Sequence, residues 1–183
     1  IHKPTNTDKR HAMTLDLELP DFELLDLPGV VDAASPMLPP GLRLRPYQAE
    51  CVAECEAAWA QGVKRILAVL ATGLGKTVIF SEIARRVVAT GGKVLILAHT
   101  DELLVQAAAK LESVSGLVAS REKAAERASL HDSVVIASIQ TLSRGPRLSG
   151  WAQDHFALVI IDEAHRSLAK SYQNIIDYFH PAN

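Results

Sequence analysis

The stretch LATGLGKT, residues 70–77, follows a short apolar run and opens a helical pattern. Glycines at positions 73 and 75 allow the backbone to curl so that its N–H groups converge on one point. The N-terminus of the following helix adds partial positive charge at the same place. A strand, a glycine-rich turn and a helix in this order predict a loop that binds phosphate groups.

The residue types in this loop suit a nucleoside triphosphate. Lys76 would reach the β- and γ-phosphates, and the Thr77 hydroxyl would bind the Mg²⁺ that bridges them. The strict motif has glycine six residues before the lysine, where this chain has Leu70. A strand–turn–helix with a surface lysine is the alternative. We expect ATP and Mg²⁺ to bind here, and the contacts would come from Thr72, Gly73, Leu74, Gly75, Lys76 and Thr77.

Apolar segments alternate with helical patterns from Pro46 onward. This alternation predicts an α/β fold, with a mostly parallel sheet covered by helices on both faces. Ligands of such a sheet bind beyond the carboxyl ends of its strands. Buried strands are expected at 65–70, 93–98, 133–138 and 156–162, with a weaker one at 116–119. Helices are expected at 46–62, 77–90, 101–114 (capped by Asp101), 121–129 and 171–179.

Residues 1–41 combine acidic, leucine-rich sequence with a cluster of prolines, which disfavours regular structure. We expect an extended arm or linker there, followed by a globular unit at 42–183. The net charge of −2 points to no nucleic-acid partner, although a local basic patch would be enough. No apolar run approaches the ~20 residues that span a bilayer. Cys51 and Cys55 make a poor zinc site, so ordinary semi-buried thiols in a cytoplasmic protein are expected.

The stretch IIDEAH, residues 160–165, places two adjacent carboxylates at the end of an apolar run. Alone, it could be a helix cap. Together with the phosphate loop it predicts a catalytic box, because the second apolar strand of such enzymes ends in an aspartate. Asp162 would hold Mg²⁺ through water, and Glu163 would orient or deprotonate the attacking water. His165 would sense the γ-phosphate.

These two stretches together resemble the first RecA-like motor lobe of superfamily 2 helicases and translocases. Four further stretches agree in order and spacing. LRPYQ, residues 44–48, resembles the adenine-recognition motif, which implies that Gln48 and Arg45 lie at the adenine. Residues 95–107 and 136–142 resemble two motifs that contact the nucleic-acid backbone. Residues 162–179 resemble the DNA-directed members, including restriction-enzyme motor subunits and XPB-type repair helicases.

The resemblance implies nucleic-acid contacts in two loops, at His99, Thr100, Gln140 and Thr141. The first loop commonly reads histidine–arginine, whereas this chain has His99–Thr100, so one cationic phosphate contact is replaced by a hydroxyl. The family's next motif and its second motor lobe, which supplies an arginine for phosphoryl transfer, would lie beyond residue 183.

The resemblance therefore implies an ATP-dependent DNA helicase or translocase that contacts the DNA backbone without regard to sequence. Two alternatives stay open. One is a nucleotide-binding module without turnover, and the other is the equivalent lobe of an RNA helicase. Stimulation of ATP hydrolysis by DNA, in a chain that includes the second lobe, would separate the first alternative from a motor.

Overall fold

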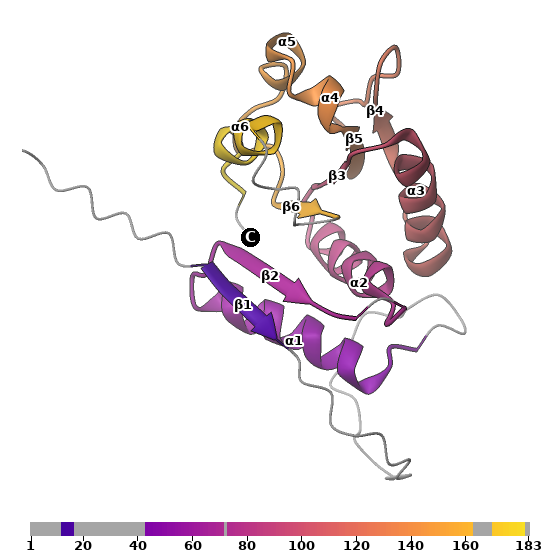
Figure 1. The fold of residues 1–183 in the computed structure, drawn as a ribbon, viewed down its shortest axis with the longest axis vertical. Helices are drawn as coiled ribbons and strands as arrows, with labels where there is room; N and C mark the ends of the chain where they lie inside the picture. The colour runs from indigo at the N-terminus through magenta and orange to yellow at the C-terminus, as the bar shows by residue number, and fades with distance from the viewer. Residues whose placement is uncertain (1–11, 17–42, 72, 163–169, 182–183) are drawn as a thin grey trace, which may run out of the picture.

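The computed structural model describes residues 12–16, 43–71, 73–162 and 170–181 (Figure 1). Its centre is a four-stranded parallel sheet in the order β4-β5-β3-β6. Two of these strands, β3 and β5, are buried along their whole lengths, as the apolar sequence predicts. The strands are β3 (Val94–Ala98), β4 (Ser120–Glu122), β5 (Val134–Ser138) and β6 (Leu158–Ile161).

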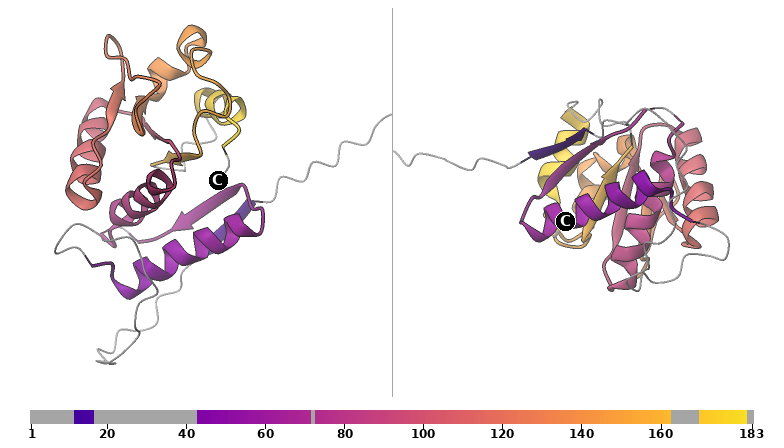
Figure 2. Two further views of the ribbon diagram at one scale, coloured as in Figure 1. Left: turned by 180° about the vertical axis from the view of Figure 1, so that it is seen from behind. Right: turned by 90° about the horizontal axis from the view of Figure 1, so that it is seen from below.

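Helices cover both faces of this sheet, and the prediction of the fold class is confirmed (Figure 2). Alternate strand residues point to opposite faces, so Ile96 and Ile136 pack on one side, whereas Leu97 and Ala137 pack on the other. The first side is covered by α1 (Pro46–Ala60), α2 (Lys76–Ala89) and α3 (Asp101–Ser115). The second is covered by α4 (Ile139–Leu142), α5 (Gly145–Leu148) and α6 (Lys170–Tyr178).

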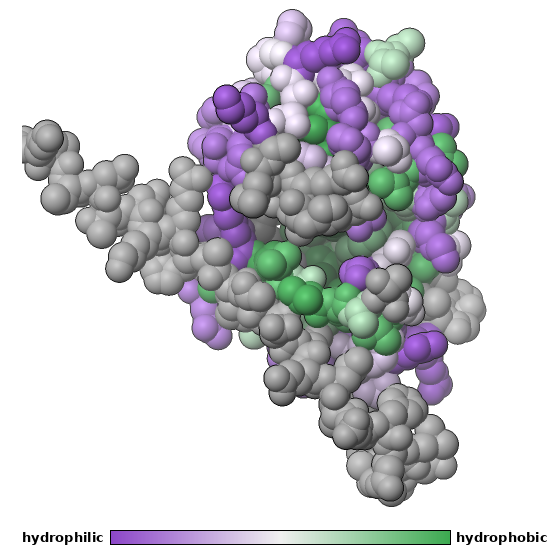
Figure 3. Space-filling model, viewed as in Figure 1, coloured by the Kyte–Doolittle hydropathy of each residue, from purple (hydrophilic) through white to green (hydrophobic). Residues whose placement is uncertain are grey.

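The strand before the phosphate loop, β2 (Arg65–Val69), lies apart from the four-stranded sheet. It pairs in parallel with β1 (Ala12–Asp16), so the N-terminal arm contributes one strand. The prediction that β2 is buried is wrong, because most of its residues are exposed, including Leu67 (41%) and Val69 (43%). Figure 3 shows apolar residues gathered along this strand. An apolar sequence indicates a strand, but it does not decide how many of its faces the rest of the chain covers.

Residues 121–129, predicted as a helix, form the end of β4 and a turn closed by a bridge between Lys123 and Glu126. Alanines are the only apolar residues in this segment, so a helix there would have little to bury against the sheet. Pairing of β4 with β5 satisfies its backbone instead. The weak strand predicted at 116–119 lies later, at β4.

The N-terminus of α3 differs from the prediction in one residue. Its cap is Thr100, whose side chain accepts a hydrogen bond from the backbone N–H of Leu103 at 3.3 Å. Asp101, the predicted cap, is the first residue of the helix, where a carboxylate still favours the positive end of the helix dipole. The helix ends at Gly116, whose φ of 72° is the left-handed conformation that glycine adopts readily.

An ion pair joins α1 to a charged cluster of α2. Glu82 is 1% exposed and accepts hydrogen bonds from Arg85 and Arg86, at 2.7–2.8 Å. Burial raises the pKa of Glu82, but the two guanidinium groups outweigh it and hold that pKa below its ordinary value. Arg86 also pairs with Glu56 of α1, at 3.0 Å. The two helices are therefore linked by charge as well as by apolar packing.

Cys51 and Cys55 are free thiols in α1, as expected, but they are more fully buried than predicted, at 0% and 4% exposure. They belong to the apolar cluster that α1 shares with α2 and the sheet. None of the described helices is both long enough and apolar enough to cross a membrane.

Substitution of two leucines, one buried and one exposed, tests whether β2 lies outside the core. Leu97 of β3 is fully buried, so Leu97→Ala should lower the free energy of unfolding by about 2–5 kcal/mol through lost burial and a cavity. Leu67→Ala, at an exposed position of β2, should cost less than about 1 kcal/mol. Urea unfolding of the two variants measures both values. A larger cost at Leu67 would show that β2 belongs to the core.

Candidate nucleotide and nucleic-acid sites

The phosphate loop connects β2 to α2 through two residues with positive φ. Gly73 has φ of 88° and Gly75 has φ of 77°. Gly75 is the N-cap of α2, so the helix begins at Lys76 and its first N–H groups face the loop. The local geometry is that of a turn that can present several N–H donors to an anion. Thr72, which was also predicted to contact the nucleotide, lies outside the described residues.

The Lys76 side chain folds back over its own loop. Its amine donates a hydrogen bond to the backbone carbonyl of Leu70, at 2.6 Å. Any residue at position 70 offers this carbonyl, so the departure from the strict glycine pattern removes no contact of this kind. The amine is exposed and lies within the loop, so a phosphate oxygen could replace the carbonyl as its acceptor.

Two side chains of α1 hold the loop from the other side. Gln48 is buried and donates from Nε2 to the carbonyl of Leu74, at 3.1 Å. The Tyr47 hydroxyl donates to the same carbonyl, at 3.0 Å. The Gln48 carbonyl accepts the backbone N–H of Arg45, at 2.9 Å. Gln48 and Arg45 thus lie beside the phosphate loop, where the sequence places the nucleotide, while the reading of adenine stays a prediction.

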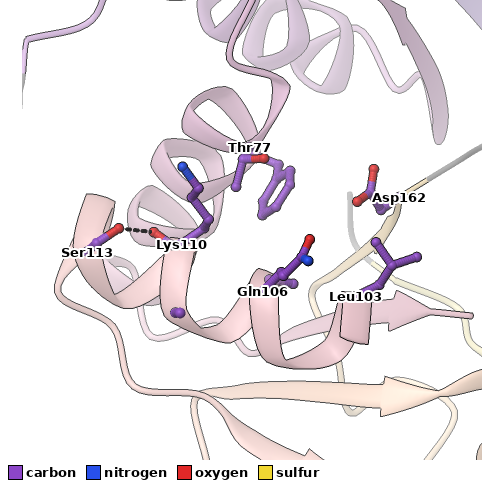
Figure 4. Close-up of a pocket in the computed structure, with 9 residues that line it drawn as sticks. Thr77, Leu103, Gln106, Lys110, Ser113 and Asp162 are labelled. Atoms are coloured by element: carbon purple, nitrogen blue, oxygen red, sulfur yellow. Dashed lines mark hydrogen bonds between the residues drawn. The ribbon is translucent and has the colours of Figure 1, made fainter. Parts of the chain in front are cut away.

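Asp162 of the acidic box and Thr77, next to the phosphate loop, line one pocket of about 400 Å³ (Figure 4). Asp162, half-buried, follows the end of β6, and Thr77 lies in the first turn of α2. Both side chains line this pocket, while their shared role at a metal ion stays a prediction. A hydroxyl and a carboxylate are ligands that suit Mg²⁺, with phosphate and water oxygens completing its shell. Glu163 and His165 lie outside the described residues.

The rest of the pocket comes from α2 and from one side of α3. Phe80 and Leu103 contribute apolar side chains to the pocket wall, and Gln106 and Lys110 contribute polar ones (Figure 4). Sequence patterns did not single out Gln106, Lys110 or Tyr47 as site residues. The spacing of four puts Gln106 and Lys110 on the same side of α3, but only the packing of α3 against α2 turns that side toward the loop.

The two loops predicted to contact nucleic acid lie side by side. β3 and β5 pair in parallel up to Ala98 and Ser138, so the residues that follow them leave the sheet at the same edge. The Gln140 amide donates to the carbonyl of His99, at 2.7 Å. Thr100 caps α3, and the Thr141 hydroxyl accepts the backbone N–H of Ala124. The structure therefore brings all four predicted residues together.

Comparison with known proteins shows what this chain resembles. Residues 41–183 match the family described as type III restriction enzyme, res subunit. A Saccharomyces cerevisiae protein named putative ATP-dependent helicase IRC3 is 41% identical over 145 residues, which are 74% of this chain and 21% of that protein. The Schizosaccharomyces pombe putative mitochondrial ATP-dependent helicase irc3 is 35% identical over 142 residues, which are 75% of this chain and 23% of that protein. The chain spans about a fifth of the length of these relatives.

Two solved structures share the fold. The Hef helicase domain of Pyrococcus furiosus has a TM-score of 0.60 at 27% identity, with 75% of this chain and 31% of that chain covered. The UvsW helicase of bacteriophage T4 has a TM-score of 0.59 at 25% identity, with 75% and 49% covered.

Because Gln48 lies close to the phosphate loop, adding a methyl group at Gly75 should destabilise the fold. A Cβ at position 75 would lie 2.7 Å from the Gln48 Nε2 atom, and φ is positive there. Gly75→Ala should therefore cost more free energy of unfolding than Gly62→Ala, where φ is +84° and nothing lies within 4 Å of the added Cβ. The control should lose about 1 kcal/mol from its backbone conformation alone. Equal losses in urea unfolding would mean that Gln48 does not hold the loop.

Proposed function

The chain belongs to the type III restriction enzyme res subunit family and is the first RecA-like lobe of a superfamily 2 helicase. We propose that this lobe binds Mg-ATP and DNA as part of an ATP-driven motor protein. The observation that carries this proposal is the shared pocket of Thr77 and Asp162, beside a loop that holds Lys76. The proposed unit is residues 42–183, preceded by an arm at 1–41. A cytoplasmic location stays a prediction.

In the proposed binding mode the loop holds the triphosphate and α1 holds the base. Backbone N–H groups at the start of α2 and the Lys76 amine contact phosphate oxygens. Thr77 and Asp162 hold Mg²⁺, Asp162 through water. Gln48 and Arg45 lie near the adenine, and Gln48 is already fixed by its contact with the Leu74 carbonyl.

The chemical step that we propose is attack of water on the γ-phosphate. Glu163 orients this water or accepts its proton, and His165 senses whether the γ-phosphate is present. The charge that develops on the phosphoryl group needs a cation opposite the phosphate loop. By resemblance to the family, we assign that cation to an arginine of a second motor lobe. ATP binding would close the two lobes, and hydrolysis would reopen them.

The loops at His99–Thr100 and Gln140–Thr141 are the proposed contact with DNA. Their hydroxyl, amide and backbone groups can form hydrogen bonds with phosphate and sugar oxygens. Such contacts do not distinguish one base sequence from another. Binding should accordingly be independent of sequence and weaken with salt. The direct hydrogen bond from Gln140 to His99 supports the idea that both loops act as one surface.

Replacement of Lys76 tests the nucleotide site. Lys76→Ala should weaken binding of Mg-ATP by about tenfold or more, because one charge-assisted hydrogen bond to phosphate is lost. Isothermal titration calorimetry measures this affinity. The control is Lys64→Ala, at an exposed lysine outside the loop, which should bind ATP like the unchanged chain. Equal affinity in the Lys76 and Lys64 variants would refute the assignment.

Steady-state ATPase rates test the motor. The chain alone should hydrolyse ATP slowly, and a longer protein that includes the second lobe should be faster by about 10³-fold with DNA present. Glu163→Gln in the longer protein should abolish turnover while ATP still binds. RNA in place of DNA distinguishes the RNA helicase alternative. If the short chain matches the longer protein with DNA present, the two-lobe mechanism is wrong.

A further inference from the structure

We propose that Glu122 and Arg147 form a positioning pair, which holds the loops after β3 and β5 in the arrangement that contacts nucleic acid. Glu122 ends β4, and Arg147 lies in the short helix α5. Neither residue belongs to a motif that the sequence identifies. The inference rests on the proposed binding of nucleic acid by those loops, and adds to it the contacts that set their geometry.

Glu122 carries a carboxylate into a buried position, where it is 3% exposed. A buried charge is costly unless it is paired and its remaining oxygen is hydrogen-bonded. Both conditions are met. Arg147 Nη1 donates to one carboxylate oxygen, and the backbone N–H of Ala128 donates to the other at 2.9 Å. The carboxylate thereby joins the end of β4 to α5 and to the far side of the turn at residues 123–126.

The same guanidinium shapes this turn. Arg147 donates to the carbonyl of Ala124 through Nη2 and to the carbonyl of Glu126 through Nη1, the latter at 3.2 Å. Ala124 has φ of 44°, a left-handed conformation that alanine rarely adopts. A strained backbone of this kind persists only where surrounding contacts hold it, and Arg147 supplies such a contact at the strained residue itself.

The turn in its place contacts both loops. The backbone N–H of Ala124 donates to the Thr141 hydroxyl, at 3.2 Å. The Lys123 amine pairs with the carboxylate of Asp101 at 2.7 Å, one residue after Thr100. The network thus runs from a buried carboxylate, through one guanidinium and one turn, to each of the two loops.

Two features favour positioning over a contribution to stability alone. Buried ion pairs stabilise a fold little better than apolar residues of the same size, whereas they fix geometry by their directional hydrogen bonds. In addition, α4 and α5 have four residues each, too few to hold a fixed orientation by their own hydrogen bonds. Glu82 provides the contrast, because its hydrogen bonds reach only residues of its own helix.

Fluorescence anisotropy with a labelled DNA oligonucleotide tests the pair, together with chemical unfolding of each variant. Glu122→Gln should weaken DNA binding by about tenfold, within the range of couplings in one hydrogen-bonded network. This direction is diagnostic, because removal of a negative charge would by itself strengthen binding to DNA. Glu82→Gln, at a buried paired carboxylate outside the loops, should lose stability and bind DNA like the unchanged chain.

Two more variants complete the experiment: Gln140→Ala, and the double variant that combines Glu122→Gln with Gln140→Ala. If Glu122 acts through the loops, the double variant should bind little more weakly than Gln140→Ala alone. Losses that multiply, or equal losses in Glu122→Gln and Glu82→Gln, would overturn the proposal. Should only Gln140→Ala weaken binding, the pair has no positioning role and the proposed interface stands. If neither variant changes binding, the interface lies elsewhere and both proposals fail.

Arg147→Lys covers the case in which Glu122→Gln fails to fold. It keeps the positive charge but cannot reach the carboxylate and two carbonyls at once, because lysine has no planar fork of donors. A loss of several-fold in DNA affinity, in a variant that remains folded, supports positioning by Arg147. Unchanged affinity would overturn it.

Discussion

Parallel pairing of β3 with both β5 and β6 is the constraint on which the sites depend. Leu97 lies opposite Ala137 on one side and Ile161 on the other, so three strands end at one edge within a residue or two of each other. Parallel strands need long crossover connections, which are usually helical, and the helices of this chain cover both faces of the sheet. The residues that follow the strands are thereby delivered to one edge. Asp162 and the two paired loops emerge there together.

The parts of the fold that sequence patterns predicted well are those with strong local periodicity. α1, α2, α3 and α6 lie within a residue or two of their predicted bounds, as do the buried strands β3 and β5. The errors arise where burial decides the outcome. RILAV has the composition of a core strand, yet β2 pairs with β1 and remains largely exposed. Residues 121–129, REKAAERAS, include good helix formers, but the first two of them form part of β4 and pair with β5.

The candidate sites divide in the same way. The placement of Thr77 and Asp162 in one pocket was predictable, because one follows a glycine-rich turn and the other follows a strand. Their roles, and that of Lys76, stay predictions. The hydrogen bond between Gln140 and His99 joins residues 41 positions apart, and no local pattern contains it. Glu122 falls in the segment predicted as a helix, 121–129, and no local pattern marks it as buried. Its partner, Arg147, lies 25 residues away.

The attachment of α1 at two places, to the phosphate loop and to α2, has a mechanical consequence. Near one end, Gln48 and Tyr47 bind the carbonyl of Leu74, and two turns or more along the helix, Glu56 binds Arg86. Two separated contacts restrict pivoting as well as sliding, so a tilt of the phosphate loop and α2 would carry α1 with it. A helix of 15 residues is about 22 Å long. A small tilt at the phosphate loop would therefore become a larger displacement at the far end of α1, where β2 begins.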